Sequence, residues 1–104
     1  MPLPAAVARE CLLGWYGANT TGRGEWRVAG QAIRPEAIRL PSLVVVPEQD
    51  RIVPPESAAA LAQALPDAAI IRPPLGHIGM VVGGRARAAL WEPMAQWLNA
   101  SLAR

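Results

Sequence analysis

Residues 43–50 read LVVVPEQD, and residues 69–77 read AIIRPPLGH. Each stretch begins with a short apolar run and ends in prolines and polar residues. Continuous apolar runs of this length, rich in β-branched side chains, are typical of parallel strands that are covered on both faces. The sequence therefore predicts parallel strands at about residues 43–47 and 69–72, with Asp50 following the first strand and His77 following the second.

A helix is predicted between these two strands. Pro55 suits the first helical position, Leu61 and Leu65 are spaced i, i+4 to form an apolar stripe, and Pro66 ends the helix. A strand–helix–strand order implies a right-handed parallel crossover. The carboxyl ends of parallel strands open on one side of a sheet, so we expect the two loops that follow the strands to meet there.

An acidic residue after one buried strand and a histidine after the next are two members of a nucleophile–His–acid triad. A carboxylate bonded to one imidazole nitrogen holds the ring in one tautomer, and the other nitrogen then reaches the nucleophile. We therefore interpret Asp50 and His77 as catalytic candidates. The same two residues could instead be an ordinary loop aspartate that makes turn hydrogen bonds and a structural loop histidine.

The order of these two residues is that of the α/β-hydrolase fold, in which the chain runs nucleophile, acid, histidine. The nucleophile should then precede Asp50 on a sharp turn flanked by glycines, and this sequence contains no such turn. Its one cysteine, Cys11, lies in the segment RECLLG on a predicted helix, and we interpret it as a small core residue. The predicted fold class is thus α/β, the C-terminal part of an α/β-hydrolase fold whose upstream sheet and nucleophile elbow are missing.

The composition narrows the function class. The chain has 104 residues, 52% of them hydrophobic, and a formal net charge of +2. Its basic residues are scattered singly, which argues against a nucleic-acid surface. A single cysteine excludes an intramolecular disulfide and a cysteine-based metal site, and we expect no metal and no cofactor. The N-terminus lacks the pattern of a signal peptide, no run is long enough to span a membrane, and we expect a cytoplasmic protein.

The remaining segments are predicted to form two parts. Residues 1–40 are expected to hold a helix over 5–16, a loop, and a small hairpin over 25–33 with Gly30-Gln31 at its turn. Residues 41–104 are expected to carry both loops and a closing helical region, with a fresh turn or a bend at Pro93.

Several motifs resemble polyhydroxyalkanoate synthases. The stretch PEQDRIVPPES at residues 47–57 is similar to the acid loop of that family, and GHIGMVVG at residues 76–83 is similar to its His loop. Two aromatic–aliphatic pairs, Leu90-Trp91 and Trp97-Leu98, resemble the family's closing helix. Upstream, WYGAN at 15–19 and GEWRVAG at 24–30 resemble the stretch that leads from the cap back to the sheet. The resemblance covers roughly residues 12–99, and the His loop is its most specific piece.

This resemblance implies a reaction and a set of roles. The family polymerises (R)-3-hydroxyacyl-CoA thioesters on an active-site cysteine without a metal. His77 would be the general base for that cysteine, and Asp50 would orient His77 or assist activation of the substrate hydroxyl. The family's Gly-x-Cys-x-Gly elbow is not found in this sequence. We therefore expect a C-terminal portion that is inactive alone and that either self-associates or needs the missing N-terminal half.

Two alternatives remain open. The parent protein could be an esterase or polyester depolymerase with a serine nucleophile, because its acid and His loops would look nearly the same. The chain could also be a non-catalytic module that folds by association, because two parallel strands need neighbours at their edges and cover on both faces.

Overall fold

The computed structural model describes residues 1–103 and divides the chain into two compact units, Met1–Arg34 and the residues from Pro35 onward. The sequence suggested a division after residue 40. The structure instead groups residues 35–40 with the second unit, where the 3₁₀ turn η2 (Pro35–Ala37) adjoins the helix that follows the first parallel strand.

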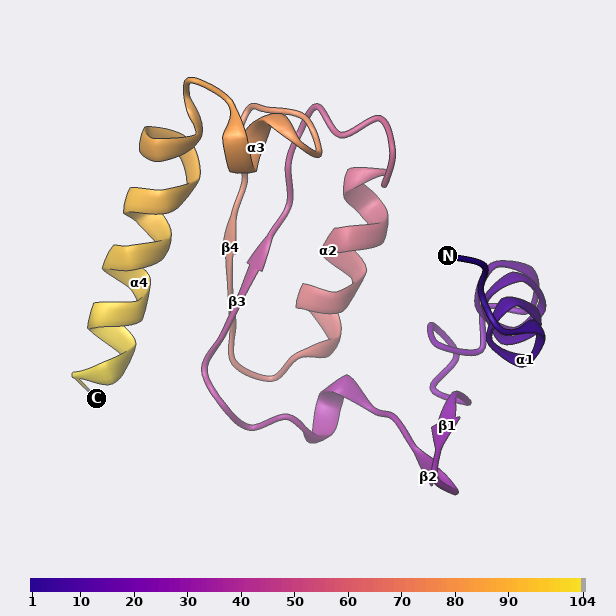
Figure 1. Cartoon of the computed structure of the whole chain (residues 1–104). Coiled ribbons are helices and arrows are strands. Elements are labelled where there is room, and N and C mark those ends of the chain that lie inside the picture. The colour runs from indigo at the N-terminus through magenta and orange to yellow at the C-terminus, as the bar shows by residue number, and fades with distance from the viewer. Residues whose placement is uncertain (104) are drawn as a thin grey trace. The chain divides into compact units, whose positions relative to one another are not determined.

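The second unit is built on a two-stranded parallel sheet (Figure 1). Strand β3 (Ser42–Val45) pairs with β4 (Ala68–Ile71) in a register that sets Ser42 opposite Ala68 and Val45 opposite Ile71. Helix α2 (Pro55–Ala64) connects them, with proline in its first turn as the sequence predicts. The parallel pair and its connecting helix are confirmed, and both strands begin and end within two residues of the predicted positions.

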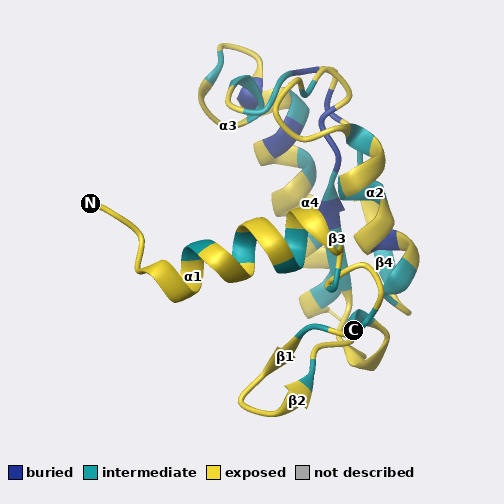
Figure 2. Cartoon of the chain, turned by 90° about the vertical axis from the view of Figure 1, so that its right-hand side faces the viewer, coloured by how far each residue is buried: buried dark blue, intermediate teal, exposed yellow. Residues whose placement is uncertain are grey.

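The core of this unit lies between β3 and α2. Val44, Val46 and Ala62 are buried, and the residues packed against them are Ala58, Ala59, Leu65 and Ala68. The buried positions appear dark blue in Figure 2. Burying one valine side chain contributes about 1.5–3 kcal/mol. The predicted stripe was half wrong, because Leu65 packs on the core but Leu61 is 47% exposed. Within α2 itself, the residues that pack in the core are alanines, Ala58, Ala59 and Ala62.

The segment after His77 is more helical than predicted. A short helix α3 (Gly79–Val82) lies where the sequence suggested a loop, and a π-helical turn η3 (Arg87–Trp91) runs directly into helix α4 (Glu92–Leu102). The Trp91 indole N–H donates to the Val81 carbonyl at 3.1 Å and so ties α3 to the closing helices. The widened turn directly before Pro93 accommodates a residue that has no N–H and whose ring crowds the preceding turn.

The first unit holds a helical segment and a hairpin. Helix α1 (Ala5–Arg9) continues as the π-helix η1 (Glu10–Gly17), where the sequence predicted one regular helix. Strands β1 (Arg27–Val28) and β2 (Gln31–Ala32) pair antiparallel around Ala29-Gly30, so the predicted turn at Gly30-Gln31 was wrong by one residue. Both turn residues have positive φ, 50° and 79°, as type I′ turns require.

Aromatic packing joins the two parts of this unit. The rings of Trp15 and Trp26 meet edge to face, with centroids 5.2 Å apart, and the Trp26 indole N–H donates to a Glu10 carboxylate oxygen at 3.0 Å. Cys11 is partly exposed, so its predicted place in a buried core is only partly met. No helix among residues 1–103 combines the length and apolarity needed to cross a membrane.

Candidate active site

Asp50 lies in the loop that follows β3, and its carboxylate is held from within that loop. One oxygen, Oδ1, accepts the backbone N–H groups of Ile52 at 2.8 Å and Val53 at 2.9 Å. An aspartate that bonds its own backbone two and three residues on closes a local turn. The Asp50 side chain is only 3% exposed, although it lies on a loop.

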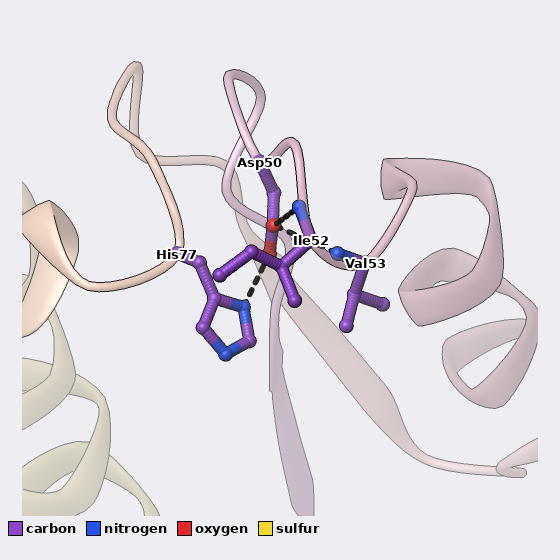
Figure 3. A network of polar contacts seen from close by, with 4 residues as sticks. All are labelled: Asp50, Ile52, Val53 and His77. Carbon is purple, nitrogen blue, oxygen red and sulfur yellow. Dashed lines mark hydrogen bonds and ion pairs between the residues drawn. The ribbon is translucent and has the colours of Figure 1, made fainter.

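His77 lies in the loop after β4 and bonds the second oxygen of the same carboxylate. The Nδ1 atom of His77 is 2.7 Å from Oδ2 of Asp50, and the two residues are separated by 27 positions in the sequence (Figure 3). The His77 side chain is 37% exposed. In Figure 3 its Nε2 atom lies on the side of the ring away from Asp50, so the second nitrogen is the one presented for chemistry.

The pairing of the two strands continues into these loops and positions both side chains. The backbone N–H of Val46 donates to the Ile71 carbonyl at 2.8 Å, that of Glu48 to Pro73 at 2.9 Å, and that of Gln49 to Leu75 at 3.1 Å. The side chains of Pro73 and Leu75 are buried. The two loops are therefore joined up to the residue before Asp50, and the approach of the acid to the histidine is fixed by backbone geometry.

The hydrogen bonds to Asp50 decide its ionisation. Burial of the carboxyl raises its pKa, but the hydrogen bonds from Val53, His77 and Ile52 outweigh burial, so the pKa of Asp50 lies below its ordinary value. An ionised carboxylate only accepts hydrogen bonds. Nδ1 of His77 must then carry the proton of the 2.7 Å bond, which leaves Nε2 of the neutral ring as an acceptor.

A half-exposed imidazole with a fixed tautomer can act as a general base toward a thiol or a hydroxyl. The sequence led to both residues, and the structure brings them together. The alternative that Asp50 makes turn hydrogen bonds also holds, because one carboxylate oxygen makes the turn and the other bonds His77. The backbone donors of Ile52 and Val53 were missed, although an aspartate at the start of a loop is the signal for such a turn.

Among residues 35–103, no thiol or hydroxyl group is hydrogen-bonded to Nε2 of His77. The only cysteine, Cys11, belongs to the first unit, and Asp50 and His77 belong to the second. Within residues 1–103, no three His, Cys, Asp or Glu side chains gather closely enough to hold a metal ion.

A small parallel sheet that presents an acid and a histidine at the carboxyl ends of its strands places this chain among mixed helix–strand proteins, compatible with part of an α/β fold. Comparison with curated proteins gives the particular resemblance. The chain is 30% identical over 84 residues to the poly(3-hydroxyalkanoate) polymerase subunit PhaC of Haloferax mediterranei, which covers 79% of this chain and 17% of that subunit. It is 32% identical over 94 residues to the subunit of the same name from Synechocystis sp., covering 88% of this chain and 25% of that subunit.

A third subunit of that name, from Allochromatium vinosum, is 31% identical over 93 residues. The resemblance to polyhydroxyalkanoate synthases that the loops suggested is thereby confirmed. The chain spans only 17% to 26% of the length of these relatives. No family model matches the chain, and no solved structure matches it.

Proposed function

We propose that this chain is the C-terminal, α/β-hydrolase-type part of a polyhydroxyalkanoate synthase-like acyltransferase and that it supplies the acid and the histidine of a Cys–His–Asp site. The observation that carries the proposal is the 2.7 Å bond between His77 Nδ1 and Asp50 Oδ2, in a chain similar to poly(3-hydroxyalkanoate) polymerase subunits. The substrates would be (R)-3-hydroxyacyl-CoA thioesters.

The proposed step is acyl transfer to a cysteine that residues 35–103 do not contain. Nε2 of His77 accepts the thiol proton, and the thiolate sulfur attacks the carbonyl carbon of the thioester. The bond from that carbon to the CoA sulfur breaks, and the departing CoA thiolate takes the proton back from Nε2. A free cysteine and an acyl-CoA thus become an acyl-cysteine and free CoA, with no change of oxidation state.

Asp50 has the geometry of an orienting residue. Its Oδ1 atom is engaged by two backbone N–H groups and its Oδ2 atom by His77. With both oxygens engaged, the carboxylate is better placed to fix the tautomer of His77 and to stabilise the imidazolium than to activate a substrate hydroxyl directly.

A chimeric polymerase tests the proposal. The segment of the Synechocystis subunit that matches this chain would be replaced by the corresponding segment of the chain, which is 88% of its length, and CoA release from (R)-3-hydroxybutyryl-CoA would be followed. We expect turnover in the chimera, its loss on His77→Ala, and retention with Gln96→Ala, a substitution at an exposed position of α4. Turnover that survives His77→Ala would refute the proposed role of the histidine.

The isolated chain provides a second test. It should release no CoA and cleave no simple ester, since no thiol or hydroxyl among residues 35–103 is hydrogen-bonded to His77. Turnover by the isolated chain that His77→Ala abolishes would show that the nucleophile is within these 104 residues. A serine hydrolase would share the same acid and His geometry, and the polymerase relatives favour the acyltransferase.

A second candidate function, an associating module, is favoured by one observation. Helix α4 and the turn before it expose a stripe of large apolar side chains on one face, comprising Trp91, Met94, Leu98 and Leu102. We expect self-association of the isolated chain, and Leu98→Lys should weaken it whereas Gln96→Lys on the same helix should not. Sedimentation velocity over a range of concentrations measures this, and a concentration-independent monomer would exclude it.

A further inference from the structure

Two large apolar side chains are exposed beside the acid–histidine pair. Ile52 in the acid loop is 69% exposed, and Ile78 in the His loop is 61% exposed. Single exposed aliphatic residues are common on protein surfaces and need no explanation. These two differ because each lies within two residues of one member of the pair, on loops that the backbone joins together.

Both isoleucines are held on anchored backbone. The N–H of Ile52 donates to Oδ1 of Asp50, so its main chain is one carboxylate group away from the His77 ring (Figure 3). The carbonyl of Ile78 accepts the N–H groups of Val81 at 3.0 Å and Val82 at 3.2 Å, which fixes it at the start of α3. Both exposed side chains therefore start from defined backbone positions in the two loops that carry Asp50 and His77.

We propose that Ile52 and Ile78 contact the alkyl part of the acyl group and so determine the preference of the site for acyl chain length. This inference rests on the proposed function and deepens it. When a thioester carbonyl lies at a nucleophile that His77 activates, the first carbons beyond that carbonyl lie within reach of the residues that border the ring. When alkyl carbons leave water and contact an aliphatic side chain, the free energy of binding falls in proportion to the apolar area that is buried.

Binding to the intact chain tests the inference without a need for turnover. The chain has six isoleucines, and their ¹³C-labelled methyl groups can be observed separately by NMR. The probes are (R)-3-hydroxyoctanoyl-CoA, (R)-3-hydroxybutyryl-CoA and free CoA. We expect the octanoyl thioester to shift the methyl signals of Ile52 and Ile78 more than the butyryl thioester does, and free CoA to leave them in place.

Substitution of single isoleucines distinguishes a specific contact from nonspecific hydrophobic binding. Ile52→Ala should weaken octanoyl-thioester binding by about three- to tenfold and butyryl-thioester binding less, because it removes apolar contact area. Ile52→Val should restore most of the affinity. Ile38→Ala removes an exposed isoleucine elsewhere in the same unit and should change neither affinity.

Several outcomes would overturn the inference: equal weakening by Ile52→Ala and Ile38→Ala, methyl shifts spread over all six isoleucines, shifts produced equally by free CoA, or no shifts with millimolar probe. The proposed function fails separately, through turnover of the chimera that survives His77→Ala.

Discussion

The backbone N–H of Glu48 donates to the carbonyl of Pro73 at 2.9 Å, beyond the last paired residues of both parallel strands. This bond continues the strand pairing toward the site. It joins the loop that carries Asp50 to the loop that carries His77, and the next bond, from Gln49 to Leu75, lies directly before the acid. The position of the acid–histidine pair thus depends on backbone pairing that continues from the sheet. A change in the backbone at Glu48 should therefore alter the Asp50–His77 geometry without changing either side chain.

Glu48→Pro removes this donor and should loosen the acid–histidine bond. We expect the chimeric polymerase to lose about 10²-fold in kcat, since small misplacements at a reacting centre have large effects on rate. The low-field proton signal of His77 Nδ1 should weaken with it. Glu48→Ala keeps the N–H and provides the matched control, which should retain both activity and signal. Equal losses in the two variants would mean that the glutamate side chain, not the backbone bond, is what matters.

Val46 has no exposed surface and packs between the sheet and α2, so its truncation should measure the strength of this small core. We expect Val46→Ala to lower the free energy of unfolding by about 2 kcal/mol, from lost burial and the cavity left behind. Val82→Ala removes the same atoms from an exposed position and should change it by less than about 0.5 kcal/mol. Urea denaturation followed by circular dichroism compares the two, and equal effects would contradict a core centred on Val46.

The positions of Asp50 and His77 were predictable because each follows directly from a short segment of the sequence. Short apolar runs predict the two strands, parallel strands open their carboxyl ends on one side, and Asp50 and His77 lie in the loops that follow. What local pattern could not supply is the backbone ladder from Glu48 to Leu75 or the turn that engages Oδ1 of Asp50, because both depend on loop conformation. The catalytic role of the pair stays a prediction.

Elsewhere the sequence was a poorer guide. The spacing of apolar residues and their helix propensity do not distinguish an α-helix from a π-helix. The sequence therefore did not predict that Glu10–Gly17 and Arg87–Trp91 would be π-helical. A leucine at helical spacing predicts a buried stripe, yet Leu61 is exposed, and the residues of α2 that pack in the core are Ala58, Ala59 and Ala62. The turn of the first unit was predicted one residue too late. Alanine at positive φ is uncommon, so the sequence favoured Gly30 as the first turn residue in place of Ala29.

That turn gives a prediction of its own. Ala29 has φ 50° at the first central position of the hairpin, where asparagine before glycine is strongly preferred. Ala29→Asn should stabilise the hairpin by about 0.5–1 kcal/mol, and Ala29→Val should destabilise it, because a β-branched side chain tolerates positive φ least. Amide exchange of Ile33, whose N–H bonds the Trp26 carbonyl at 2.8 Å, reports on the hairpin. Slower exchange in the valine variant would contradict the turn geometry.

Acid should remove the contribution of Asp50 to stability. Because the pKa of Asp50 is lower in the folded chain than its ordinary value of 3.8, the unfolded state binds more protons in this range, and stability falls as pH falls. The contribution is fully present above about pH 5 and is lost as pH falls through the folded pKa.

Asp50→Asn cannot ionise, so it should be less stable than the parent chain near neutrality and should approach it at low pH. Glu48→Gln removes an exposed carboxyl from the same loop and should keep the parent's slope. Urea midpoints measured from about pH 3 to pH 7 distinguish the variants. If Asp50→Asn kept the full acid dependence of the parent chain, the hydrogen bonds from Val53, His77 and Ile52 would not be what stabilises the ionised carboxylate.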